Sequence, residues 1–157
     1  MKMIYFEDIE LGLREELGSY TFTAEDIIQF ASEWDPQVFH TDPEAAKDSI
    51  FGGLVASGWH VNVIWMKLIV ASRLNRMRKE GFRMAGGVSP GFKDMKWLVP
   101  VRPGDTLTYF STSAAKVDLK SRPEFGILQS HNEAVNQDGV TVMTFTGQAY
   151  MRKRPKE

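Results

Sequence analysis

Hydrophobic positions in the first half of the chain recur at helical spacing. Four apolar side chains follow the i, i+3, i+4, i+7 pattern of one helix face: Ile27, Phe30, Ala31 and Trp34. Thr23 is suited to cap the start of this helix, and Pro36 ends it because a proline drives the preceding residue out of helical geometry. Asp42-Pro43 has the form of a cap followed by a first-turn proline, which predicts a second short helix through Lys47. Residues 35–41 are therefore expected to form a loop between two helices.

A longer apolar segment opens at Ser57-Gly58 and runs to about Arg78. Before Ser72 its only polar side chains are His60, Asn62 and Lys67. A helix that is apolar on most sides belongs in a core, so this segment is expected to be enclosed by the rest of the chain.

The second half of the chain has the residue pattern of β-strands. Four strand-like runs are separated by turn signals rich in proline, glycine and aspartate: 84–98, 106–119, 125–135 and 140–151. A first strand is expected at Gly18–Phe22. Because short connections favour antiparallel neighbours, the pattern predicts an α+β domain in which a curved antiparallel sheet wraps one long helix.

The composition of the chain argues against several classes of protein. The 157 residues suit one domain spanning 1–157, and 19 Lys and Arg against 20 Asp and Glu give a net charge of −1, which argues against non-specific nucleic-acid binding. The absence of cysteine excludes disulfides, thiolate metal sites and a cysteine nucleophile. No stretch is apolar for the length of a membrane span, and acidic residues follow the start too soon for a signal peptide, so a cytoplasmic protein is expected.

One pair of side chains suggests acid–base chemistry. Asp35 and His40 lie five residues apart, next to the apolar Trp34, Val38 and Phe39. Apolar surroundings raise the pKa of a carboxyl group and strengthen a neighbouring charge, which is how catalytic groups are tuned. The alternative is that Asp35 ends a helix and His40 makes a local hydrogen bond.

The glycines at 52, 53 and 58 form a second candidate site. If the long helix begins near Ser57, the N–H of Gly58 has no intrahelical acceptor, and glycine lets a ligand come close to this backbone. Such a donor can stabilise an oxyanion on an ester or thioester. Tight packing of the glycines is the alternative interpretation. A nucleophile elbow would need glycine where Val55 stands, so Ser57 is not expected to be a nucleophile.

The remaining polar residues point to structural roles. His131 is expected to be a structural strand residue and His60 a core or capping residue. Asp35, His40 and His60 have suitable residue types for zinc but lack a zinc-site spacing, so no metal or other cofactor is expected. The basic runs 73–79 and 152–154 are interpreted as solvated faces.

Taken in order, these motifs resemble the MaoC-like hotdog-fold family, which includes (R)-specific enoyl-CoA hydratases and dehydratases. The motifs are the Asp35/His40 pair, Phe51–Gly58, Trp97–Asp105, Ser121–Pro123 and Asn136–Gly139. The resemblance implies that Asp35 and His40 activate the water that adds to a trans-2-enoyl thioester, and that the Gly58 amide holds the thioester oxygen. It also implies an acyl-CoA substrate and a homodimer, with further assembly open.

Three positions depart from the family pattern. Gln37-Val38 replaces the usual Asn-Pro, Ser57 stands where many members have histidine, and Met66 replaces a serine found in some hydratases. The open alternatives are a hotdog acyl-CoA thioesterase, in which a carboxylate activates water against the carbonyl carbon, and a non-catalytic acyl-CoA binding module. Four basic residues are candidates to contact CoA phosphates: Lys93, Lys96, Arg102 and Arg122.

Overall fold

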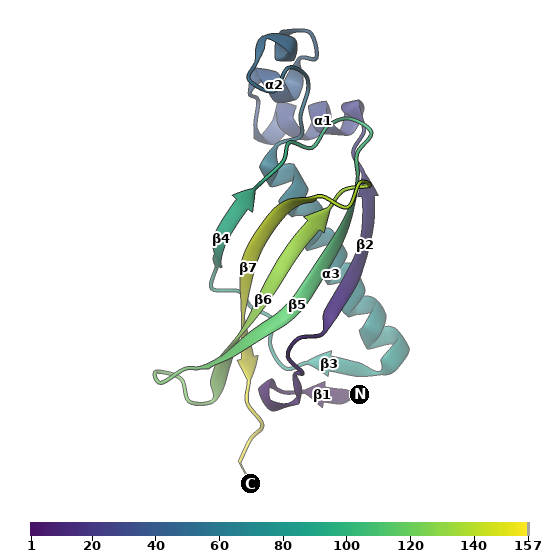
Figure 1. Ribbon diagram of the computed structural model, residues 1–157. Helices are drawn as coiled ribbons and strands as arrows, with labels where there is room; N and C mark the ends of the chain where they lie inside the picture. The colour runs from purple at the N-terminus through teal and green to yellow at the C-terminus, as the bar shows by residue number, and fades with distance from the viewer. Residues whose placement is uncertain (157) are drawn as a thin grey trace.

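A five-stranded antiparallel sheet curves around one long helix in the computed structural model, which describes residues 1–156 (Figure 1). The strand order is β2-β5-β6-β7-β4. The strands are β2 (Arg14–Thr21), β4 (Phe92–Trp97), β5 (Thr106–Asp118), β6 (Phe125–Val135) and β7 (Thr141–Arg152). The last three follow one another through short turns, as the turn signals predicted, and the α+β class is confirmed.

Helix α3 (Gly58–Glu80) is the enclosed element. It begins where the sequence predicted, with the Ser57 hydroxyl accepting from the Trp59 N–H, and ends at Gly81 in the left-handed conformation at φ 68°. Its buried side faces the sheet, where the hydroxyl of the fully buried Tyr109 donates to the Val61 carbonyl at 3.0 Å. This hydrogen bond fixes the first turns of α3 to β5.

The other side of α3 is exposed, contrary to the expectation that the whole helix is enclosed. Trp59, Val63, Met66 and Val70 are spaced along one face and are 51%, 51%, 52% and 45% exposed. A single copy of the chain therefore leaves one apolar face of this helix exposed.

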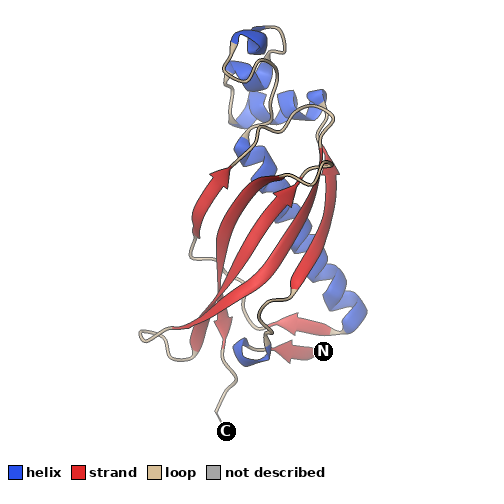
Figure 2. Cartoon of the chain, in the orientation of Figure 1, coloured by secondary structure: helices blue, strands red, loops and turns tan. Residues whose placement is uncertain are grey.

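An overhang of short helices stands at one end of the sheet (Figure 2). It consists of α1 (Ala24–Trp34), α2 (Val38–Thr41) and the 3-10 turn η2 (Ala45–Asp48). The Thr23 hydroxyl accepts from the Asp26 N–H at 3.1 Å, so the predicted cap is confirmed.

The overhang differs from the prediction in three details. The expected loop at 35–41 contains the single turn α2, and the expected second helix through Lys47 is the 3-10 turn η2. Trp34, assigned to the buried face of α1, is 69% exposed because it occupies the last helical position, beyond the core.

The boundaries of two strands also differ from the predicted ones. The run 84–98 contains parts of two strands with different partners, and the segment 85–91 between them is joined to β7 by an isolated bridge between Gly86 and Met151. The first part of the run belongs to β3 (Phe82–Met84), which pairs in parallel with β1 (Lys2–Ile4), an element that sequence analysis missed together with the turn η1 (Phe6–Asp8). The expected strand Gly18–Phe22 begins earlier, at Arg14, within polar residues that are mostly exposed on this edge strand.

Within residues 1–156, no helix combines the length and the apolar character needed to cross a bilayer.

Candidate active site

The overhang brings Asp35 and His40 together. Asp35 caps the end of α1, and its N–H donates to the Ala31 carbonyl, while His40 lies on α2. His40 Nε2 lies 3.4 Å from Asp35 Oδ2, and the side chains are 8% and 18% exposed. The turn at Pro36 thus places the two side chains side by side, as their spacing suggested.

The tautomer of His40 follows from its other nitrogen. Nδ1 lies 2.7 Å from the Val55 carbonyl oxygen, which can only accept a hydrogen bond, so Nδ1 carries a proton. In the neutral ring, Nε2 then holds a lone pair and faces the Asp35 carboxylate. This nitrogen is available to take a proton from a molecule bound in the cavity beside the two groups.

Asp35 receives a donor on each carboxylate oxygen. Gln37 Nε2 donates to Oδ1 at 2.8 Å, and the Ser57 hydroxyl donates to Oδ2 at 2.7 Å. Burial raises the pKa of the Asp35 carboxyl, but these two hydrogen bonds and the nearby His40 outweigh it, so that the pKa lies below its usual value. The raising effect expected from the apolar neighbours is present, but the net pKa shift is downward because of donors that the sequence did not reveal.

Ser57 is a site residue whose role the sequence reasoning missed. It is 1% exposed, donates to Asp35 and accepts from the Trp59 N–H, so one hydroxyl both caps α3 and holds the carboxylate. Gln37 has a similar role. In the sequence, Gln37 stood out only as a departure from the family pattern, and Ser57 as that and as the start of the long helix.

Gly58 is the first residue of α3, as expected. Both interpretations of this glycine apply, as a backbone N–H donor and as a position of tight packing. No hydrogen bond from its N–H occurs in the described part of the chain, as expected at a helix start. A Cβ at this position would collide with the indole of Trp97, so glycine is also required for packing. The indole is held by a hydrogen bond from Nε1 to Asn62 Oδ1 at 2.9 Å and by edge contact with Trp59.

A cavity of about 480 Å³ joins these groups. Its polar wall contains Asp35, Gln37 and His40, and its other walls are apolar and aromatic, with Gly58, Trp59 and Trp97 among them. A cavity with a few polar groups in an apolar lining is typical of a small-molecule site. This arrangement can hold an acyl group beside a base and a backbone donor.

The other histidines lie outside this cavity. The His60 ring stacks on Phe30 at 4.5 Å and contacts the edge of Phe22 at 4.9 Å, which makes it a core residue. His131 is half exposed on β6, 3.9 Å from Glu133.

The proposed phosphate contacts are spread over the chain. Arg102 is close to the overhang, because its guanidinium donates to the Phe51 carbonyl at 2.6 Å, and Lys93 and Lys96 lie on β4. Arg122 belongs to the β5–β6 connection, which lies at the end of the sheet opposite the overhang (Figure 1). Distance from the site removes Arg122 as a candidate.

Comparison with known proteins agrees with the fold and with the resemblance. Residues 13–134 match the MaoC like domain family. The chain is 30% identical over 138 residues to the uncharacterised protein YdeM of Bacillus subtilis, which covers 87% of this chain and 90% of that protein. The crystal structure of the MaoC-like dehydratase from Rhodospirillum rubrum superposes with a TM-score of 0.82 at 37% identity, over 98% of this chain and 99% of that one.

An (R)-hydratase from A. caviae involved in PHA biosynthesis shares the fold, with a TM-score of 0.67 and 21% identity over 95% of this chain and 99% of that one. The predicted hotdog fold is confirmed.

Proposed function

The chain belongs to the MaoC-like domain family, and from this premise we propose that it catalyses the reversible hydration of a trans-2-enoyl-CoA to an (R)-3-hydroxyacyl-CoA. The observation that carries the proposal is the Asp35/His40 pair, 3.4 Å apart, in one cavity with the amide that opens α3. The names of two similar proteins, a MaoC-like dehydratase and an (R)-hydratase, are consistent with the proposal.

His40 is the base in this proposal. A water that contacts both side chains from the cavity gives a proton to His40 Nε2 while its oxygen forms a bond to C3 of the enoyl group. The electrons of the C2=C3 bond move toward the thioester carbonyl, and the imidazolium then returns a proton to C2. Asp35 is the weaker base because hydrogen bonds hold its pKa low, but its negative charge stabilises the imidazolium.

The Gly58 N–H supports the enolate-like oxygen. The amide lies at the positive end of a 23-residue helix and has no partner among the described residues. A single donor of this kind is worth about 3–4 kcal/mol in known enzymes.

We place this chemistry in a homodimer. The sheet ends at β4, and Phe92 and Trp97 on this strand are 51% and 47% exposed, beside the exposed face of α3. Because Trp59 and Trp97 also line the cavity, a second copy covering this face would complete its mouth. Light scattering should show a dimer for the wild type and a monomer for Val63→Glu, with Lys79→Glu, at an exposed lysine on the opposite side of the same helix, as the control.

The test of the reaction is loss of the absorbance of the conjugated enoyl thioester, measured with crotonyl-CoA and with longer and branched analogues. Asp35→Asn and His40→Ala should each lower kcat/KM by about 10²–10⁴. His131→Gln, at a histidine outside the cavity, should match wild type.

The same experiment distinguishes the rival functions. Release of free CoA thiol without loss of the double bond would identify a thioesterase. Tight binding of acyl-CoA without turnover across the substrate panel would identify a binding module. If Asp35→Asn and His40→Ala hydrate the best substrate at the wild-type rate, the assigned roles are wrong.

A further inference from the structure

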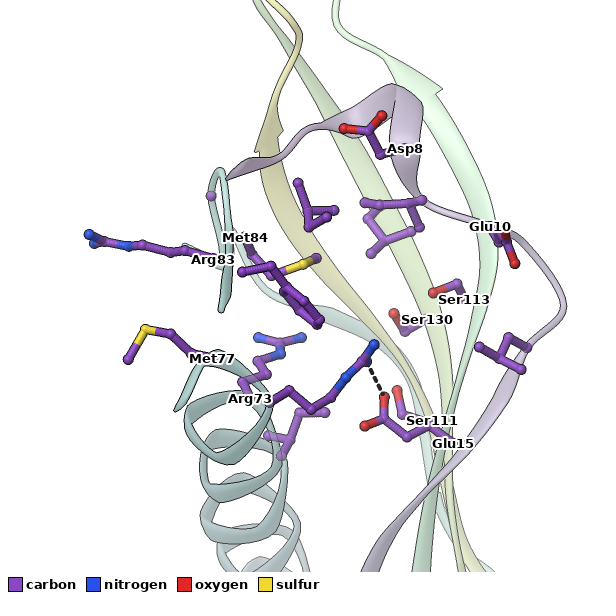
Figure 3. Close-up of a pocket in the computed structure, with 18 of the residues that line it drawn as sticks. Asp8, Glu10, Glu15, Arg73, Met77, Arg83, Met84, Ser111, Ser113 and Ser130 are labelled. Carbon is purple, nitrogen blue, oxygen red and sulfur yellow. Dashed lines mark ion pairs between the residues drawn. The ribbon is translucent and has the colours of Figure 1, made fainter. Parts of the chain in front are cut away.

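A second cavity, of about 570 Å³, lies at the other end of α3 (Figure 3). The C-terminal half of α3 forms one wall, strands β2, β5 and β6 form the opposite wall, and η1, β1 and β3 close the end. It shares no lining residue with the cavity at Asp35 and His40. It also takes no residue from β4, so it lies away from the edge proposed for the dimer.

The sheet wall of this cavity is polar where a core would be apolar. Ser111 and Ser113 on β5 and Ser130 on β6 line it, and Ser113 and Ser130 are paired in register. No hydrogen bond of their hydroxyls occurs among residues 1–156. The register partner of Ser111 is Asn132, which is completely buried and whose Oδ1 has no donor within the same residues. Polar groups on the inner face of a sheet are normally paired, so these hydroxyls are available to a ligand.

Arg73 supplies a cation on the opposite wall. It lines the cavity from α3 and keeps contact with solvent, and no ion pair of its guanidinium is found in the described chain. Figure 3 shows Arg73 on the helix side and the three serines across from it on the strands.

The other charges of this cavity are paired or point away. Glu15 accepts from Ser72 at 2.7 Å and pairs with Arg76 at 3.5 Å, the dashed contact in Figure 3. Asp8 pairs with Arg154 at 2.7 Å.

Two charged side chains remain at the rim. Arg83 projects away from the cavity, and Glu10 lies on its outer side, across from Arg73 (Figure 3). Among the described lining residues that face inward, Arg73 is therefore the cation without an ion pair, and the charge of Glu15, itself paired with Arg76, also acts on it.

We propose that this second cavity binds a monoanionic amphiphile, a medium-chain carboxylate whose head group meets Arg73 and the serine hydroxyls. A guanidinium binds a carboxylate through two parallel hydrogen bonds. One cation without a partner matches a single negative charge, whereas a phosphate monoester would bring nearly two. The apolar body of the ligand packs against Leu13, Met77 and Met84, which also line the cavity.

The experiment uses the methionine methyl groups as reporters. Octanoate is titrated into protein labelled with ¹³C at the methionine methyl groups, and the NMR signals of Met77 and Met84 should shift. Met95 reports on the other cavity, because its sulfur accepts from Asn62, which holds Trp97. Shifts confined to Met95 would place the ligand at the first cavity and overturn the proposal.

Variants of Arg73 and Ser130 test whether octanoate binding depends on the charge and on the hydroxyls. Arg73→Gln should weaken octanoate binding about tenfold or more, as expected for loss of a charge-assisted hydrogen bond. Arg78→Gln, a cation on the same helix outside the cavity, should bind as wild type. Ser130→Ala is a second variant that keeps the charge and should also weaken binding.

Two further ligands separate the possible chemistries. Octanol should bind far more weakly than octanoate, and equal binding would overturn the role of the cation. Octyl phosphate binding more tightly than octanoate would overturn the assignment of a carboxylate. Asp35→Asn should leave octanoate binding unchanged, so this test does not depend on the proposed reaction.

Discussion

Ser57→Ala is the substitution that tests most directly how the site is held. It removes one hydroxyl with two roles: the cap of α3 and the donor to Asp35 Oδ2 at 2.7 Å. Loss of a helix cap costs about 1 kcal/mol, and loss of a hydrogen bond to a charged group costs about 1.5–3 kcal/mol.

The expected loss of unfolding free energy for Ser57→Ala lies near the lower end of these values. The Asp35 side chain is 18% exposed, so water can replace part of the lost hydrogen bond. We expect a loss of about 2 kcal/mol, which for a domain of this size lowers Tm by about 4–8 °C. Thermal unfolding followed by circular dichroism at pH 7 measures this loss. Ser32→Ala, at an exposed serine of α1, is the control and should change Tm little.

Ser57→Ala should also change the titration of the carboxyl. Because the lost donor lowers the pKa of Asp35, this pKa should rise in the variant. Titration of the Asp35 carboxyl carbon by NMR reads the same change without an activity assay. Ser57→Thr keeps the hydroxyl and should recover much of both effects. A Tm equal to that of Ser32→Ala, with an unchanged Asp35 titration, would refute the reasoning.

Three further predictions concern the surroundings of the site. Gly58→Ala keeps the amide donor but collides with Trp97, so kcat/KM should fall and urea unfolding should show a loss of about 1–3 kcal/mol; wild-type values would mean that the indole is not held there. Burial lowers the pKa of His60, so this residue destabilises the fold as pH falls below about 6.5; His60→Phe should remove that part of the pH dependence of Tm, and His131→Gln should keep it. Tyr109→Phe should cost about 1 kcal/mol in urea unfolding through loss of the bond to the α3 carbonyl, and an unchanged midpoint would contradict this.

The sequence was most informative where the determinants are local. The start of α3 at Ser57-Gly58 and the cap at Thr23 follow from residues next to one another, and the structure has both. The proximity of Asp35 and His40 was also predictable, because a proline turn within six residues allows few alternatives.

The missed features depend on residues far apart in the chain. Ser57 reaches Asp35 across 22 positions, and Trp97 on β4 reaches Gly58 at the start of α3, so neither contact leaves a local pattern. The lowered pKa of Asp35 was missed for the same reason. The start of β2 was missed because an edge strand exposes polar side chains and loses the alternation by which strands are recognised.

The donors on both oxygens of Asp35 hold its carboxylate in one orientation, which affects the entropy cost of a reaction at this site. A carboxylate that rotated freely would lose side-chain entropy each time it aligned with a bound water, and this loss would add to the activation barrier. Here the alignment is complete once the chain has folded, so the site is preorganised before any acyl group enters. Crystal structures with and without ligand should accordingly show the Asp35 side chain in one rotamer.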